Sequence, residues 1–141
     1  MKKSVSQNSE QNPASKAAPA IEPDSLWTEG DISIRKGNCN VLLIAPHGHP
    51  KNDTNSAKLA RKIADQLDCY AVINEKFQKP STAGYKRSNL KGYAVDLNNW
   101  REAEKFRKTK AEFLDVIEKF KKAILQTGSP AMLVHIHGIR N

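Results

Sequence analysis

The chain contains four histidines, which fall into two pairs, His47 with His49 and His135 with His137. Each pair comes at the end of a short apolar run, and Asp53 lies shortly after the first pair. Neutral imidazole is the commonest protein ligand for metals, and a catalytic zinc takes about three protein ligands and a water molecule. A histidine and a nearby carboxylate from one loop, completed by a distant histidine, make up such a set. The pattern predicts a Zn2+ site held by His47, Asp53 and His137.

The choice of ligand within each pair follows from strand geometry. Residues two apart on a strand face the same side, so His135 and His137 are expected to point together, and His137 is nearer the carboxyl end. We therefore assign His137 to the metal, and His135 either supports the metal ligands from behind or contacts the substrate. His49 is an alternative to Asp53 as a ligand. The competing interpretation is structural: Asp53 is then only a helix N-cap, and the histidines are only hydrogen-bonded residues.

The residues around the histidines predict alternating strands and helices. Residues 40–46 and 69–73 are short apolar runs typical of buried strands, and residues 56–67 between them have helical spacing. This order is a βαβ unit, whose strands are parallel. A third buried strand is expected at 131–136, after a long helix over 102–125. Ligands bind at the carboxyl ends of such strands, where all four histidines are expected.

The predicted fold is therefore α/β, with a mainly parallel sheet and flanking helices. The first helix is expected to bury one apolar stripe, made of Leu59, Ala60, Ile63, Ala64 and Leu67. Apolar residues recur at helical spacing in the long helix, at Phe106, Phe113, Ile117, Phe120 and Ile124. The pair Phe113 and Phe120 is expected to belong to the core and not to contact a cofactor. Residues 75–95 predict a long surface loop, and residues 32–34 a short edge strand.

Composition sets the limits of the folded part. Residues 1–23 have almost no large apolar side chains and predict a disordered tail, which leaves an α/β domain at 24–141. The formal charge is +8, but the basic residues of 101–122 are interleaved with acids, which argues against a dedicated nucleic-acid surface. The absence of a secretory signal and of a membrane span predicts a cytoplasmic protein. Cys39 and Cys69 are expected to be buried, reduced thiols.

Four stretches of the sequence occur in the order found in the N-formylglutamate amidohydrolase family, a branch related to the zinc carboxypeptidases. They are Leu42-Leu-Ile-Ala-Pro-His-Gly48, Asp53-Thr-Asn-Ser-Ala-Lys-Leu-Ala60, Val95-Asp-Leu-Asn98 and Ile136-His-Gly138. The resemblance implies a phosphorylase/hydrolase-like fold with one zinc on His47, Asp53 and His137. It also implies hydrolysis of an amide bond next to a carboxylate, as in N-acyl amino acids or glutamyl peptides.

The same resemblance implies residues that hold the substrate carboxylate. The family has an Asp-Leu-Asn-Arg segment, in which the arginine suits a carboxylate. Here Asn98 matches the asparagine, Asn99 replaces the arginine, and Arg101 is the expected substitute. The chain also stops after the third predicted core strand, before the family's acidic general base. The domain is therefore expected to be incomplete, with its catalytic residues unknown and its hydrolase activity impaired.

Two alternatives stay open. One is a metal- or carboxylate-binding module that uses the same cleft without catalysis. The other is a basic α/β interaction protein in which the histidines are structural. If the chain does hydrolyse a substrate, the proton acceptor is expected among Glu75, Asp96 and His135. The sequence specifies neither the exact substrate nor the oligomeric state.

Overall fold

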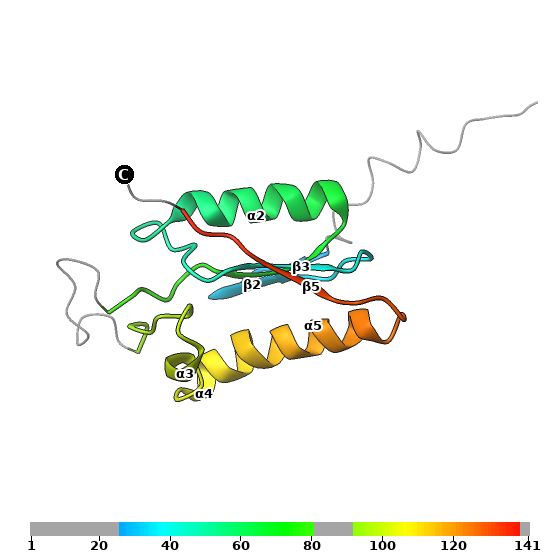
Figure 1. Cartoon of the computed structure of the whole chain (residues 1–141). Coiled ribbons are helices and arrows are strands. Elements are labelled where there is room, and N and C mark those ends of the chain that lie inside the picture. Colours follow the sequence, from blue (N-terminus) through cyan, green and yellow to red (C-terminus); the bar gives the residue numbers. More distant parts are fainter. Residues whose placement is uncertain (1–25, 81–91, 139–141) are drawn as a thin grey trace, which may run out of the picture.

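A computed structural model describes residues 26–80 and 92–138 of the chain. Within these residues, one sheet has the strand order β1-β2-β4-β3-β5 (Figure 1). Its strands are β1 (Trp27–Thr28), β2 (Ile32–Arg35), β3 (Val41–Ala45), β4 (Tyr70–Asn74) and β5 (Met132–His135). The predicted tail at 1–23 lies outside the described residues.

The pairing of the strands makes the sheet mixed. β3 leads into helix α2 (Thr54–Leu67) and then β4, and β3 pairs with β4 in parallel, so the βαβ prediction is confirmed. β5 pairs in parallel with the other side of β3. β2 pairs antiparallel with both β4 and β1. Between β1 and β2, residues 29–31 are too few for the crossover of a dozen or more residues that parallel strands need. The fold is thus α/β as predicted, but only its core strands are parallel.

Helices cover both faces of the sheet (Figure 1). Helix α2 lies on one face, and α5 (Asp115–Leu125) lies on the other. Because side chains alternate along a strand, neighbouring residues of β3 belong to different layers. Leu42 and Ile44 pack in the core with α5, and Leu43 and Ala45 pack in the core with α2. This double burial explains why β3 is continuously apolar.

Helix α2 buries part of the predicted stripe, with Ile63 partly buried against the same core. Ala60 and Ala64 are buried as expected, but Leu59 and Leu67 are 51% and 64% exposed. The buried side chains of α2 are Ser56, Ala57, Ala60 and Ala64. These small side chains let the helix axis lie close to the sheet, and the larger leucines are left on the solvent side. Size rather than hydrophobicity therefore selects the buried stripe.

The helix predicted over 102–125 is interrupted once. α3 (Trp100–Ala103) precedes the interruption, and α4 (Arg107–Thr109), the π-helix η4 (Lys110–Leu114) and α5 follow it without a gap. The interruption includes Phe106, whose backbone is extended and whose side chain is exposed. The Thr109 hydroxyl donates to the carbonyl oxygens of Ala103 and Phe106, which satisfies carbonyl groups at the end of α3.

The later part of the predicted helix behaves as expected. Phe113 and Phe120 are fully buried, with Ile117 and Ile124 beside them in the same core. The prediction that the phenylalanine pair is core is confirmed. The helical period alone did not reveal the break, because Phe106, at the break, lies seven residues before Phe113 and so keeps the helical spacing.

Two expectations about strands are wrong. β5 is an edge strand with Met132 57% exposed, and not a third buried strand, because only β3 pairs with it. β2 is not an edge strand, because it lies between β1 and β4. β2 is internal because the short β1 pairs with its outer side, and β5 is at the opposite edge because no described strand pairs with its other side.

The described ends of the predicted surface loop 75–95 pack into the core. Phe77 and Val95 are buried, and Gln78 forms an isolated parallel bridge with Ala94. The segment that precedes α3 therefore runs beside the segment that follows β4. Residues 81–91, the middle of the predicted loop, lie outside the described residues.

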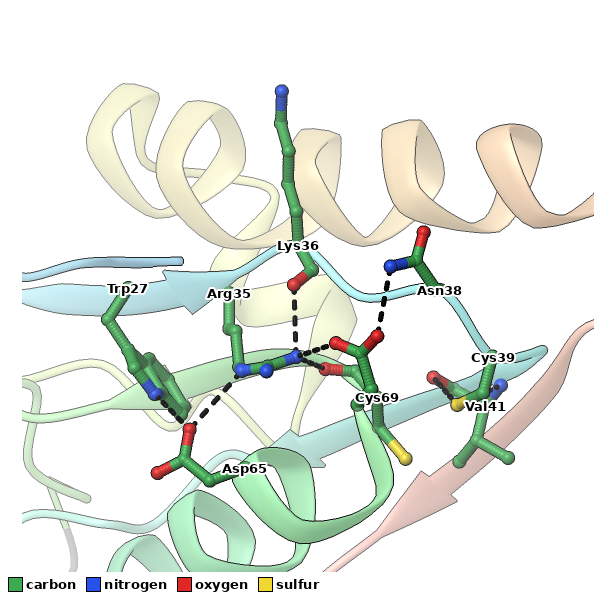
Figure 2. A network of polar contacts seen from close by, with 9 residues as sticks. Trp27, Arg35, Lys36, Asn38, Cys39, Val41, Asp65 and Cys69 are labelled. Atoms are coloured by element: carbon green, nitrogen blue, oxygen red, sulfur yellow. Dashed lines mark hydrogen bonds and ion pairs between the residues drawn. The ribbon is translucent and has the colours of Figure 1, made fainter. Parts of the chain in front are cut away.

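A network of polar contacts closes the amino end of the sheet, where β3 and β4 begin (Figure 2). Its centre is Arg35, which is only 6% exposed. Arg35 Nη1 donates to Asp68 Oδ1 at 3.0 Å and to the carbonyl oxygens of Cys69 and Lys36 at 2.9 and 3.0 Å. Its Nε donates to Asp65 Oδ1 at 3.3 Å. The network joins the end of β2 to the turn between α2 and β4.

Candidate metal site at the carboxyl end of the sheet

The carboxyl end of the sheet, where β3, β4 and β5 finish, carries the histidines. Parallel pairing places Ile44 of β3 opposite His135 of β5, and the Ile136 N–H donates to the Ile44 carbonyl oxygen at 2.8 Å. The chain therefore leaves both strands at the same level. His47 and His137 follow there, with ring centres 5.4 Å apart and an interplanar angle of 68°. The predicted meeting of the two distant histidines is confirmed.

The spacing of these two rings suits a shared metal ion. Zinc binds imidazole nitrogen at about 2.0–2.1 Å in a tetrahedral arrangement, which puts the centres of two bound rings roughly 5 Å apart. Burial lowers the pKa of His137, and the positive charge of a protonated His47 lowers it further. His137 is therefore neutral near pH 7, which is the form that binds metals.

His47 has a carboxylate partner that sequence patterns did not assign to it. His47 Nε2 lies 2.8 Å from Asp96 Oδ1, and the same oxygen accepts the backbone N–H of Asn98 at 3.0 Å. The contact with His47 is the largest of the causes that lower the pKa of Asp96, against the opposing effect of burial. Asp96 is thus ionised and His47 Nε2 is the donor. The Val95-Asp-Leu-Asn98 stretch contains this aspartate, but the sequence indicates Asp96 only as a candidate proton acceptor and not as a partner of His47.

Asp53 caps α2 and also lies beside the His137 ring. Its Oδ1 accepts the Ser56 N–H at 3.2 Å, so the predicted N-cap is confirmed. Its Oδ2 accepts the N–H of Gly138, the residue that follows His137. The carboxylate is also close enough to His137 for its charge to raise the pKa of that ring, against the lowering causes. Asp53 therefore stands beside the ring pair while it caps the helix.

The glycines after the two histidines have a different use from the expected one. We expected Gly48 and Gly138 to let the backbone approach a bound group. Instead, a Cβ at Gly48 would collide with the Asn74 carbonyl oxygen and with Ala57, and a Cβ at Gly138 would collide with the Asp53 carboxylate. The glycines let the protein pack tightly against itself at the carboxyl end of the sheet.

The remaining histidines take separate positions. His49 Nδ1 accepts the Lys51 backbone N–H at 3.0 Å within the turn before α2, so one of its ring nitrogens is used locally. The His135 ring is stacked between His137, at 6.1 Å, and Trp100, at 5.8 Å. His135 thus continues the row of rings away from His47 toward α3. This position is compatible with the predicted substrate contact.

The residues predicted to hold the substrate carboxylate are not gathered at the ring pair. The backbone of Asn98 contacts Asp96, but its side chain is exposed, and Asn99 caps α3 by accepting the Glu102 N–H. Arg101 lines a cavity of about 210 Å³ between α3, η4 and α5, together with Trp100, Glu104, Leu114, Ile117 and Glu118. Among the described contacts, none joins Arg101 to His47, Asp53 or His137.

The donor set at the ring pair fits zinc in chemistry, with one adjustment. Among the described residues, no three histidine, cysteine, aspartate or glutamate side chains already converge as a metal-binding group. His47 and His137 have a suitable spacing, whereas Asp53 is turned toward backbone N–H groups. A carboxylate has about four lone-pair sites, so Asp53 can keep an N–H contact and still reach a metal after a small rotation.

Comparisons with protein-family models, with curated proteins and with solved structures found no match for the chain. The resemblance to the N-formylglutamate amidohydrolases therefore stays a prediction that rests on four stretches of sequence. Within residues 26–80 and 92–138, no helix is long and apolar enough to cross a membrane.

Proposed function

We propose that the chain is a zinc-dependent hydrolase of the N-formylglutamate amidohydrolase type, built on a phosphorylase/hydrolase-like fold. Its zinc ligands are His47, Asp53 and His137, and its substrate is an N-acyl amino acid or a glutamyl peptide. The observation that carries the proposal is the row Asp96, His47, His137, in which a carboxylate holds one imidazole 5.4 Å from a second one.

The contact with Asp96 prepares His47 for a metal. Histidines that bind metals almost always donate their other ring N–H to a carboxylate, a carbonyl or a water molecule, which fixes the tautomer and the ring orientation. In neutral His47, an Nε2–H that donates to Asp96 leaves the lone pair of Nδ1 for a metal. No described hydrogen bond engages Nδ1.

The proposed reaction divides its tasks between zinc and the protein. Bound zinc would polarise the amide carbonyl and lower the pKa of its water molecule. The protein orients the ligands: Asp96 holds His47, and the capping contacts with Ser56 and Gly138 hold Asp53. His135, stacked between His137 and Trp100, offers a ring surface to the rest of the substrate.

A second candidate function is metal binding without catalysis, and the positions of the three named proton acceptors favour it. Asp96 is engaged by His47, and Glu75 forms an ion pair with Arg61 at 2.8 Å. His135 is held between two rings. A missing general base costs roughly 10²–10⁴-fold in rate. We therefore expect hydrolysis to be absent or slow even when zinc is bound.

Zinc content tests the metal site. We expect about one zinc per chain after dialysis against a weak chelator, and loss of zinc in His47→Ala and His137→Ala, because losing one of three ligands removes the geometry of the site. His49→Ala should keep its zinc if Asp53 is the third ligand, because His49 lies outside the ring pair; loss of zinc in this variant would instead favour His49 as the alternative ligand. Stoichiometric zinc in both ligand variants would contradict the assignment.

Turnover of N-formyl-L-glutamate separates the two candidate functions. A zinc-loaded chain that hydrolyses it at about 1 s⁻¹ or faster, a usual enzyme rate, would establish the hydrolase and remove the expectation of impairment. Slow turnover that disappears in His137→Ala would support an impaired hydrolase. No turnover together with one zinc per chain would support the binding module.

A further inference from the structure

A lysine that the sequence patterns did not single out lies at the carboxyl end of the sheet. The Lys79 backbone N–H donates to Asn52 Oδ1 at 3.2 Å, and Asn52 immediately precedes Asp53. The preceding residue, Gln78, bridges Ala94, two residues before Asp96. The backbone of Lys79 is thereby held between the turn that delivers Asp53 and the segment that delivers Asp96.

The charge of Lys79 reaches the candidate metal site. Its ammonium group contributes to lowering the pKa of His137 and also that of Asp96, so it acts on both ends of the row of ligands. The two carboxylates of the site already have partners, since Asp96 is engaged by His47 and Asp53 by backbone N–H groups. Within the described residues, Lys79 forms no ion pair at 4.0 Å or less. The Lys79 side chain is half-buried. It is thus a cation beside the site, and no described carboxylate neutralises it, so it can pair with an anion.

The position of Arg101 is less suitable for an anion. Its cavity is also lined by Glu104 and Glu118, so two carboxylates face one guanidinium group. A substrate carboxylate would be repelled there by the unbalanced negative charge. Near Lys79, by contrast, a bound divalent metal would add positive charge, because its proposed ligands include only one carboxylate.

We propose that Lys79 binds the carboxylate of the substrate at the His47–His137 site, in the role that was expected of Arg101. The inference rests on the proposed function and specifies its substrate class: an amide whose acid group can reach a lysine beside the metal. A lysine is a point charge and not a planar fork, so it holds one carboxylate oxygen without fixing the plane of the group. The site then tolerates acyl amino acids with side chains of different lengths.

Binding of N-acetyl-L-glutamate to the zinc-loaded full chain tests the proposal, measured by calorimetry. Lys79→Gln should weaken binding about tenfold or more, the loss expected for one hydrogen bond to a charged group. Lys79→Arg should recover most of the affinity. Lys76→Gln removes the next lysine, which lies over the Tyr93 ring, and is the matched control that should bind as the wild type does.

A second probe separates carboxylate recognition from damage to the site. N-acetyl-L-alanine methyl ester has no carboxylate, so its weaker binding should be the same in wild type and Lys79→Gln. Equal affinity of wild type and Lys79→Gln for N-acetyl-L-glutamate, with zinc bound, would overturn the role of Lys79 and leave the metal site intact. So would a larger loss in Arg101→Gln. A chain that takes up no zinc contradicts the proposed function instead, and the same titration without metal then shows whether Lys79 binds the anion alone.

Discussion

The two ends of the sheet use polar residues in opposite ways. At the amino end, Arg35 is almost fully buried and donates hydrogen bonds to two carboxylates and two backbone carbonyl groups (Figure 2). At the carboxyl end, His47 uses one nitrogen on Asp96, and no hydrogen bond among the described residues engages His137. One end is saturated by its own contacts, whereas the other keeps coordinating groups available. We therefore expect substitutions at the amino end to change stability, and substitutions at the carboxyl end to change the proposed zinc binding.

The path of the chain explains why the ends differ. At the amino end, the turn after α2 and the link after β2 meet, and residue Asp68 closes that turn in the left-handed backbone region. At the carboxyl end, the chain leaves β3 and β5 and starts α2, whose N-terminus is the positive end of the helix dipole. Asp53 caps this terminus. The carboxyl end therefore combines side chains that loops deliver with a helix N-terminus that favours negative groups.

The largest effect is expected at the saturated end. Arg35→Met should lower the free energy of unfolding by about 2–3 kcal/mol, because the Cys69 carbonyl loses a buried, charged donor. Zinc affinity should not change, since Arg35 lies at the far end of the sheet. Lys36→Met is the control: its exposed side chain predicts a change within about 0.5 kcal/mol. Urea denaturation measures both, and a loss of zinc in Arg35→Met would show that the two ends are coupled.

The next effect is expected at the binding end. Asp96→Asn should weaken zinc binding about 10–100-fold while the fold keeps its stability, because partners of metal-bound histidines have effects of this size. The variant keeps the shape of the side chain and loses the charge that holds His47 Nε2 as a donor. A zinc titration against a competing indicator measures the change. Unaltered affinity would mean that Asp96 only anchors the loop through Asn98.

The core strands and the first helix could be predicted from the sequence, because their signals are local. The run 41–45 is apolar on both faces, and Asp53 is a cap with a helix after it. The placement of β1 and the edge position of β5 could not be predicted, because they depend on which strand pairs with which. The break at Phe106 could not be predicted either, because the Thr109 hydroxyl contacts that accompany it do not change the spacing of apolar residues in the sequence.

The candidate site divides in the same way. His47 and His137 could be placed together, since parallel strands bring their carboxyl ends to one place. The partner of His47 could not be assigned, because Asp96 arrives from a segment without a regular element of its own. The position of Lys79 beside the site could not be predicted for the same reason, because it depends on a contact with Asn52 across the site. Residues that strands deliver were predictable, and residues that loops deliver were not.

A smaller effect separates the two roles of Asp53. Asp53→Ala should lose about 1 kcal/mol of stability in the absence of metal, because α2 loses its cap, whereas Asp53→Asn should stay near the wild type, since asparagine caps equally well. Both variants should bind zinc more weakly, because both lack the carboxylate. Thermal unfolding with and without chelator gives the two quantities. If Asp53→Asn keeps full zinc affinity, Asp53 is only a cap and His49 becomes the third candidate ligand.

The smallest effect concerns a second arginine and tests whether burial or the number of partners sets the energy at the amino end. Arg61 also pairs with two carboxylates, those of Glu29 and Glu75, and its guanidinium group lies 4.5 Å from the Trp27 ring centre. Its side chain is 29% exposed, however, against 7% for Arg35. Solvated ion pairs contribute about 0–1 kcal/mol, so Arg61→Met should cost less than about 1 kcal/mol in urea denaturation. Added salt should reduce even this difference, because exposed pairs are screened. If Arg61→Met lowers the free energy of unfolding as much as Arg35→Met does, the number of partners matters more than burial for these two arginines.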